Sequence, residues 1–366
     1  MAAAPILAEC ARLAAGGGTG ALASVARRRG SLPMSGTAKM LVTTSGGGAR
    51  VGTVGGGCLE AEIIERAIDV AECRRPCISE HTLNAEAAGD YGLTCGGTAM
   101  MLIEPVYGDS SLVAIYDACT ALMSRGSRAV MATSYDWSAG IAKLLLGEAT
   151  TVGTAAPELV AAALAYDPLA ELPELREGVL IEAVAGSPRL VVFGGGHVGA
   201  RVAEAAAFAG WRVTVADDRP EFADATRLPF AESAVVCEYH ALPESLAIDA
   251  ATYVVVATRG HQHDALVVEQ IARLDTRYLG MLGSRRKVAL TWRLLEMAGV
   301  PRERLQRVRA PVGLSIGADT PEEIAISVVA EMVAVRRAGS RRRGGVDGPA
   351  GEEEGVRPGI SPSETR

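Results

Sequence analysis

The chain has 366 residues, of which 49% are hydrophobic, 22% charged and 4% aromatic. This apolar content is sufficient for buried cores and excludes a disordered protein, and the length is typical of two domains. The formal net charge of −7 argues against a general nucleic-acid-binding or anionic-membrane-binding surface, because either would need clustered positive charge. We therefore expect neither nucleic acid nor membrane among the partners.

The seven cysteines are an odd number, and the sequence contains no recognisable secretion signal. The apolar start of the chain is interrupted by Glu9 and Arg12, which is typical of an amphipathic helix. No uncharged stretch approaches the roughly 18 residues of a membrane span. We expect a cytoplasmic protein with reduced thiols.

The first half of the chain predicts a small α/β domain. Glycine-rich residues 45–48 separate two β-prone runs, which favours a hairpin, and the next segment has helical periodicity. The expected elements are a helix at 5–15, a strand at 21–27, hairpin strands at 40–44 and 50–54, a helix at 59–73, a strand at 98–104, a helix at 112–125, and strands at 129–133 and 179–184.

The second half alternates short buried strands with helical segments, the pattern of a parallel sheet with crossover helices. Strands are expected at 189–193, 211–216, 234–238, 253–258 and 278–282. Thr320-Pro321-Glu322-Glu323 marks a capped helix that should end near Arg337. The predicted fold class is therefore α/β, with a C-terminal Rossmann-like parallel sheet and a small N-terminal α/β domain. We predict domains at 1–187 and 188–338, followed by a disordered tail at 339–366.

Residues 194–199 fit the pattern G-x-G-x-x-G between a strand and a helix. Gly194, Gly196 and Gly199 would let a pyrophosphate approach the helix N-terminus, with His197 in the same turn. Asp217, at the end of the next strand, could accept a hydrogen bond from a ribose hydroxyl, and Arg219 could accommodate a 2′-phosphate. The alternative is that the glycines serve only strand–helix packing.

Two further loops are expected at the same sheet edge. The loop 258–264 contains Arg259, His261 and Asp264 and could form a metal or acid–base site. Because His-x-His offers only two ligands, we favour a helix-capping role for Asp264 and loop or phosphate contacts for the histidines. The loop 283–287 places Ser284 and three cations, Arg285, Arg286 and Lys287, at a helix start, where they could bind an anion or simply be solvated.

Two cysteines lie in glycine-rich turns. Cys58 follows three glycines and opens a helix, where the helix dipole favours a thiolate, and Cys95 lies in a similar turn. Each could be a soft metal ligand, a nucleophile, a persulfide carrier or a buried apolar residue. Cys73 and Cys77 form a C-x₃-C pair with no second pair for zinc. The remaining cysteines fall in apolar patterns typical of a core: Cys10, Cys119 and Cys237.

Several motifs, taken together and in this order, resemble the xanthine dehydrogenase accessory protein family (XdhC/CoxI). They are Gly30-Ser31-Leu32-Pro33 with Gly36 and Met40, Gly55-Gly56-Gly57-Cys58-Leu59-Glu60, Gly92-Leu93-Thr94-Cys95-Gly96-Gly97, residues 278–286, and residues 310–318 running into 320–325. The resemblance spans about residues 5–338. It departs from the family at Met34, where an arginine is usual, so an anion contact expected there would be missing.

The resemblance implies a maturation chaperone rather than a catalyst, with no catalytic residues assigned. Such a protein binds molybdenum cofactor, supports its sulfuration by a cysteine desulfurase, and delivers it to a molybdenum hydroxylase apoenzyme. A homo-oligomer such as a dimer is also expected. Cys58 and Cys95 would be possible soft ligands to molybdenum. The cofactor-binding residues would be Cys58, Cys95, Gly194, Gly196, His197, Gly199, Asp217, Arg219, Arg259, His261, Ser284, Arg285 and Arg286.

Two other functions remain open from the residues alone. An NAD(P)-dependent oxidoreductase would use the glycine loop and Asp217, but the first domain offers only His81 as an acid or base. A nucleotide-sensing scaffold would bind nucleotide and regulate partner docking without chemistry.

Overall fold

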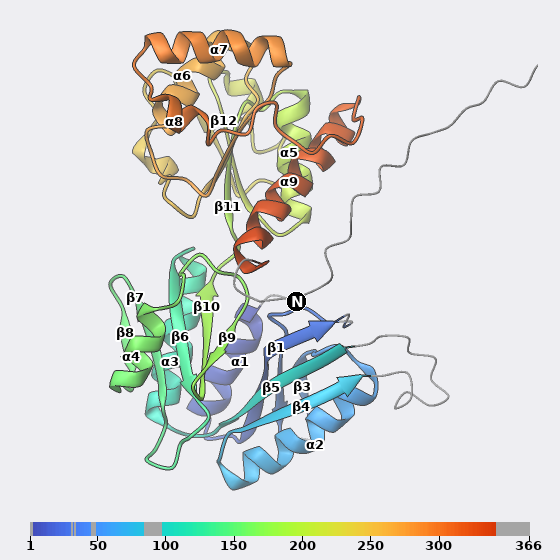
Figure 1. Ribbon diagram of the computed structural model, residues 1–366, viewed down its shortest axis with the longest axis vertical. Helices are drawn as coiled ribbons and strands as arrows, with labels where there is room; N and C mark the ends of the chain where they lie inside the picture. The colour runs from blue at the N-terminus through green and yellow to red at the C-terminus, as the bar shows by residue number, and fades with distance from the viewer. Residues whose placement is uncertain (1–2, 31, 33, 45–48, 84–96, 342–366) are drawn as a thin grey trace, which may run out of the picture.

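The computed structural model describes residues 3–341 except 31, 33, 45–48 and 84–96. The chain forms two lobes, a lower one ending with β10 and an upper one beginning with β11 (Figure 1). Within the described residues, no helix has the length and apolar content needed to cross a membrane.

The lower lobe begins with a unit of two helices and five antiparallel strands. Its elements are α1 (Ala3–Ala15), β1 (Gly20–Gly30), β2 (Lys39–Thr43), β3 (Arg50–Gly52), α2 (Gly57–Cys73), β4 (Cys77–Leu83) and β5 (Gly97–Val106). The strands lie in the order β3-β2-β1-β5-β4. Helix α2 packs on one face of this sheet through Leu59, Ile63 and Ala67.

A second unit of the lower lobe repeats this arrangement. Its elements are α3 (Ser110–Ser124), β6 (Arg128–Ser134), β7 (Lys143–Gly147), β8 (Thr151–Gly153), α4 (Pro157–Leu164), β9 (Glu174–Arg176) and β10 (Val179–Ala185). The strand order is β8-β7-β6-β10-β9. Element by element, this is the order of the first unit, so the lower lobe is a tandem structural repeat.

The ion pairs between the two units also follow the repeat. Lys39, the first residue of β2, pairs with Glu182 of the second unit at 2.7 Å, and Lys143, the first residue of β7, pairs with Glu104 of the first unit at 2.5 Å. Each lysine therefore reaches a carboxylate on the last strand of the other unit. Helices α1 and α3 share one hydrophobic cluster, which joins the two units.

The upper lobe is a doubly covered parallel sheet in the order β13-β12-β11-β14-β15. Its strands are β11 (Arg189–Phe193), β12 (Arg212–Asp217), β13 (Ser233–Val236), β14 (Tyr253–Val256) and β15 (Tyr278–Met281). Its helices are α5 (His197–Phe208), η2 (Pro220–Phe222), η3 (Glu244–Leu246), α6 (His261–Ile271), α7 (Arg285–Met297), α8 (Arg302–Leu305) and α9 (Pro321–Arg341).

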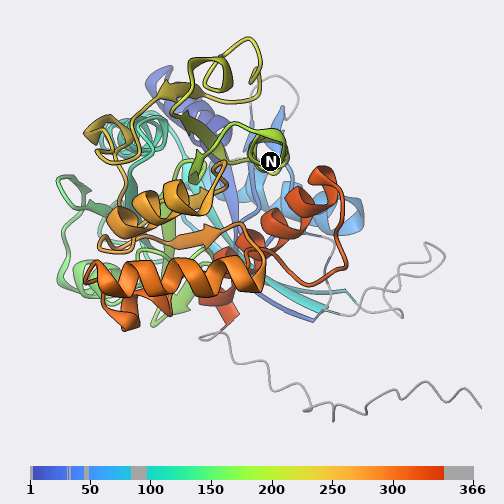
Figure 2. The same cartoon turned by 90° about the horizontal axis from the view of Figure 1, so that it is seen from above.

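The central strands β11 and β14 of the upper sheet are buried on both faces, whereas the edge strand β13 is partly exposed. Val191 and Phe193 pack toward α6 and α7, whereas Leu190 and Val192 pack toward α5 and α9. Figure 2 shows α7 (orange) and α9 (red) as separate layers of this lobe. The predicted α/β class with a C-terminal Rossmann-like sheet is confirmed.

Two local predictions, the hairpin of the first unit and the capped start of the last helix, are confirmed. The predicted hairpin forms between β2 and β3, although its turn, residues 45–48, lies outside the described residues. At the start of α9, Glu323 N–H donates to Thr320 Oγ1 at 3.3 Å and Thr320 N–H donates to Glu323 Oε2 at 3.1 Å. The helix continues through 339–341, which the sequence predicts as tail, and residues 342–366 lie outside the described residues.

The three cysteines predicted as core residues are buried. Burial raises the pKa of the Cys119 thiol to about 12 and that of Cys237 to about 11. It also raises the pKa of Cys10 well above its usual value. These thiols are therefore protonated and inert at neutral pH.

Candidate functional site

The glycine loop joins β11 to α5 at the carboxyl edge of the parallel sheet. Gly194 has φ +107°, and its N–H donates to Ala216 O at 2.8 Å. A Cβ at Gly195 would lie 2.1 Å from Phe222 O, and one at Gly199 would lie 1.8 Å from Gly194 O. These glycines are required by the packing of the chain on itself.

Gly196 differs from its neighbours because a Cβ there would meet no atom within 4 Å. It is the N-cap of α5, has no side chain to cap the helix, and is followed by exposed His197. The first-turn N–H groups of α5 thus have no side-chain acceptor at this end. This is the place in the loop where an anion could approach the helix.

Asp217 lies at the end of β12, as predicted, but its side chain is fully buried. Its Oδ2 accepts from Gly195 N–H at 2.8 Å and from Arg219 Nη2 at 3.1 Å. Its Oδ1 accepts from the Arg219 N–H at 3.0 Å and from Arg219 Nε at 2.9 Å. A carboxylate offers about four acceptor positions, so the chain itself fills them. In this conformation Asp217 organises the glycine loop and has no free acceptor for a ribose.

Burial alone would raise the pKa of Asp217, but hydrogen bonds from Arg219 and Gly195 outweigh it and lower the pKa. Arg219 in turn lies 3.6 Å above the ring of Phe222. The arginine is therefore fixed against both the carboxylate and an aromatic ring, and it closes the end of β12.

Asp218 is a residue of this edge that the sequence does not single out. Its Oδ2 accepts from Arg259 Nη2 at 2.7 Å, whereas its buried Oδ1 has no hydrogen-bond partner. Through this contact the exposed side chain of Arg259 links the loop after β14 to the end of β12. The two adjacent aspartates, 217 and 218, could have indicated this residue, but the sequence alone does not tell which of the two carboxylates is buried and which is partly exposed.

The loop 258–264 is built around a buried carboxylate. Asp264 Oδ1 accepts from Thr258 N–H at 3.2 Å and from Thr258 Oγ1 at 2.5 Å, and Lys287 Nζ lies 2.5 Å from its Oδ2. Asp264 thus joins the loop after β14 to the start of α7, rather than capping α6, whose N-cap is Gly260. His261 is half-buried, and His263 packs edge-on against Tyr239 at 5.7 Å.

The loop 283–287 presents two cations that have no ion-pair partner among the described residues. Ser284 caps α7 by accepting from Lys287 N–H at 3.3 Å, and Arg285 and Arg286 are exposed in the first helical turn. Lys287 itself is engaged by Asp264 and by Leu282 O at 3.3 Å. The anion-binding prediction for this loop therefore depends on the two arginines.

Of the two predicted cysteines, Cys58 is in the other lobe. Cys58 is the second residue of α2, whose N-cap Gly56 has φ +77°, and Gly56 N–H donates to Glu60 Oε2 at 3.1 Å. Nothing is described for the Cys58 side chain, and Cys95 lies outside the described residues. The structure brings together the residues at 194–219, 259–264 and 284–287, and it places the start of α2 in the lower lobe (Figure 1).

Met34, which stands where the resembled family has an arginine, is buried in the core of the first unit. It supplies no cation at that position. Among the residues that the structure describes, no group of three or more His, Cys, Asp or Glu side chains is placed to hold a metal ion.

The carboxyl edge of the upper sheet is thus suited to an anion. It combines the uncapped starts of α5 and α6 with the exposed cations Arg259, Arg285 and Arg286. A phosphate-bearing ligand fits this set of donors. The set does not by itself distinguish a dinucleotide from another phosphate ester.

Comparison with known proteins gives two matches that lie in different lobes. Residues 13–81 match the XdhC and CoxI family, and residues 190–332 match the XdhC Rossmann domain. Together these segments span more than half of the chain.

Two curated proteins are similar over 86% of this chain. The uncharacterized protein YqeB of Escherichia coli is 30% identical over 322 residues, which are 43% of its own length. A probable xanthine dehydrogenase subunit of Bacillus subtilis is 26% identical over 322 residues, which are 93% of its length. The chain therefore spans less than half of the first relative and nearly all of the second.

A crystal structure of a xanthine dehydrogenase from Bacillus halodurans has a similar fold. It superposes with a TM-score of 0.69, covers 95% of this chain and 98% of its own, and is 24% identical. At that identity the likeness concerns the fold.

Proposed function

The chain belongs to the XdhC and CoxI family, and from this we propose that it is an accessory factor for a xanthine dehydrogenase or a related molybdenum hydroxylase. In the proposed role it binds molybdenum cofactor, supports its sulfuration by a cysteine desulfurase, and delivers it to the apoenzyme. The protein acts as a carrier in this scheme.

The observation that carries the proposal is the presence of both family regions in one chain, each with its own chemistry. The region 13–81 contains Cys58 at the start of α2, and the region 190–332 contains the anion-suited sheet edge. When bound, molybdenum cofactor supplies a phosphate-bearing pterin with sulfur and molybdenum. Such a ligand calls for anion contacts and for soft thiol ligands.

The residues divide the task as follows. Arg285 and Arg286 would hold the phosphate together with the open N-terminus at Gly196 and with Arg259. Asp217 would keep the glycine loop in place by accepting a hydrogen bond from Gly195 N–H. Cys58 and Cys95 would relay sulfur from the other lobe rather than contact the ligand held at this edge, and the position of Cys58 at a helix N-terminus after glycines favours a thiolate.

The test is cofactor retention by the full chain purified from a host that makes molybdenum cofactor. Bound molybdenum is measured by mass spectrometry and the pterin by fluorescence after oxidation. We expect Arg285→Gln with Arg286→Gln to lower both readouts severalfold. Arg293→Gln, exposed farther along α7, is the matched control and should retain the cofactor.

The thiol role is tested separately by Cys58→Ala with Cys95→Ala. We expect cofactor retention or activation of the apoenzyme to fall. If both survive, the thiol role is wrong, and if the wild-type chain retains no cofactor, the carrier role is wrong.

An NAD(P)-dependent oxidoreductase remains the alternative, and one atom favours it. Asp218 Oδ1, at the end of β12 where a ribose would lie, has no hydrogen-bond partner among the described residues, although Arg219 Nε lies 3.7 Å from it. Calorimetric titration with NAD⁺, NADH and the corresponding phosphorylated forms decides the matter. Absence of heat in all four titrations removes this alternative.

A further inference from the structure

The two lobes have separate hydrophobic cores. Each cluster of buried apolar side chains among the described residues lies wholly before residue 186 or wholly after residue 189. Lobes without a shared apolar core are free to move unless polar contacts hold them. What fixes their orientation must therefore be sought at the junction.

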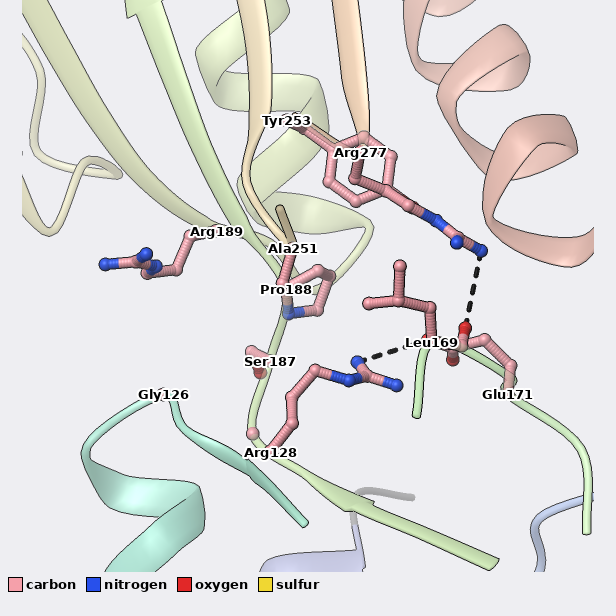
Figure 3. Close-up of a pocket in the computed structure, with 11 residues that line it drawn as sticks. Gly126, Arg128, Leu169, Glu171, Ser187, Pro188, Arg189, Ala251, Tyr253 and Arg277 are labelled. Carbon is pink, nitrogen blue, oxygen red and sulfur yellow. Dashed lines mark hydrogen bonds and ion pairs between the residues drawn. The ribbon is translucent and has the colours of Figure 1, made fainter. Parts of the chain in front are cut away.

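The loop between α4 and β9 is the part of the lower lobe that makes polar contacts with arginines of the upper lobe. Three successive carbonyls of this loop accept from arginines: Pro168 O from Arg128 Nε at 2.9 Å, Leu169 O from Arg277 Nη2 at 3.3 Å, and Ala170 O from Arg128 Nη2 at 3.3 Å. Arg128 belongs to the lower lobe and Arg277 to the upper one. Figure 3 shows both guanidinium groups pointing toward Leu169 and Glu171.

Glu171, the next residue of this loop, is the ionic centre of the junction. Its carboxylate lies 3.0 Å from Arg336 and 3.9 Å from Arg337, both on α9, and 3.7 Å from Arg128. Its side chain is only 15% exposed, so these pairs are less screened than surface pairs. Arg336 also lies 5.5 Å above the Trp211 ring, which fixes it within the upper lobe.

The junction also contains a small pocket. It is lined by residues of both lobes, among them Arg128, Glu171, Ser187, Tyr253 and Arg277 (Figure 3). It lies at the amino end of the parallel strands, opposite the glycine loop. The junction is therefore not completely packed beside the ionic contacts.

In the connection between the lobes, Gly186 packs against the lower lobe and Pro188 is hydrogen-bonded to the upper lobe. A Cβ at Gly186 would lie 2.3 Å from Met123 O, so this glycine is packed against the end of α3. Pro188 O accepts from Arg212 N–H at 2.8 Å in the upper lobe. Exposed Ser187 lies between these two anchors and is the natural pivot.

We propose that residues 167–172 form an electrostatic latch, in which Glu171 with Arg336 and Leu169 with Arg277 hold the upper lobe in its described orientation, and that release of the latch lets the lobes turn about Ser187. The latch concerns the junction alone and does not depend on the proposed cofactor. Because it is ionic, it weakens as salt concentration rises.

The test measures the distance between lobes in the full chain by single-molecule energy transfer. Dyes are attached through non-natural amino acids at Leu164 and Met297, which are 72% and 85% exposed and lie in different lobes. The variants are Glu171→Gln and Arg336→Gln. The control is Glu204→Gln, which removes an ion pair with Arg201 within α5 of the upper lobe.

We expect one distance population for the wild type at low salt and a severalfold gain of a second population for Glu171→Gln and for Arg336→Gln. The double variant should add nothing further, and the control should match the wild type. High salt should populate the second state in the wild type as well. Circular dichroism and thermal melting verify that each lobe remains folded.

Unchanged distances in both single variants at every salt concentration would overturn the latch. The same holds if the Glu204→Gln control changes the distances as much as Glu171→Gln. If Glu171→Gln does not fold, Arg336→Gln and Arg277→Gln provide the same test from the upper lobe.

Discussion

At the scale of single residues, Asp217 illustrates what the sequence leaves undetermined. Its position at the end of a strand was predictable, because a glycine loop and a following strand define that site. Its partners were not, because they depend on Arg219 turning back onto the carboxylate and stacking on Phe222. The sequence locates the residue, and side-chain packing decides whether it faces a ligand or the protein.

We predict that Asp217→Asn lowers the free energy of unfolding of the upper lobe by about 2–3 kcal/mol at neutral pH, since it removes the buried charge that accepts from Arg219. The pKa of Asp217 is lowered in the folded state. Its contribution is therefore complete above the unfolded-state value of about 3.9 and is lost as pH falls through the folded-state pKa. Urea unfolding from pH 7 to pH 2.5 checks this.

The control for that measurement is Asp224→Asn, a fully exposed carboxylate in the same lobe. It changes the net charge equally and should destabilise the lobe far less. A variant at Asp217 that loses no more stability than this control would show that the buried network contributes little.

At the scale of elements, the parallel strands were predictable and the second repeat of the lower lobe was not. Strands such as β11 and β14 are continuous apolar runs, because helices cover both faces of the sheet. In contrast, β8 and β9 have three residues each and α4 has eight, too few to display a period. Strand β4 was also missed, next to a segment outside the described residues.

The repeat itself predicts matched effects at matched glycines. Gly52 and Gly153 have φ +95° and +102°, and a Cβ at each would lie 2.3 Å and 2.2 Å from the carbonyl of Lys39 and Lys143 respectively. We expect Gly52→Ala and Gly153→Ala to lower the midpoint of thermal unfolding by similar, large amounts. The physical reason is a backbone clash added to the strain of positive φ.

Gly140→Ala separates these two effects, because Gly140 has φ +112° but no atom within 4 Å of a Cβ. It should show the strain alone, about 1–2 kcal/mol. If Gly153→Ala is no worse than Gly140→Ala, the two repeats are not packed equivalently.

At the scale of the whole molecule, the two lobes should unfold as two cooperative units. Ile63 and Met332 are fully buried, in the lower and upper lobe respectively. We predict that Ile63→Ala and Met332→Ala each destabilise one lobe by about 2–5 kcal/mol, because each leaves a cavity in a separate core.

Differential scanning calorimetry of the full chain checks this, with hydrogen exchange assigning each transition to a lobe. Each variant should shift one transition and leave the other in place. A single transition that moves equally in both variants would mean that the polar junction couples the lobes as strongly as a shared core would.

The reciprocal pairs of Lys39 with Glu182 and Lys143 with Glu104 are what two subunits of a symmetric dimer would make across their axis. Here both partners are encoded in one polypeptide, so a change at one position is not copied to its mate. Glycines precede Cys58 in the first unit, whereas Ala155-Ala156-Pro157 precede Glu158 in the second. Because the two units belong to one polypeptide, the turn before α2 can differ in sequence from the turn before α4 while the reciprocal ion pairs between the units are kept.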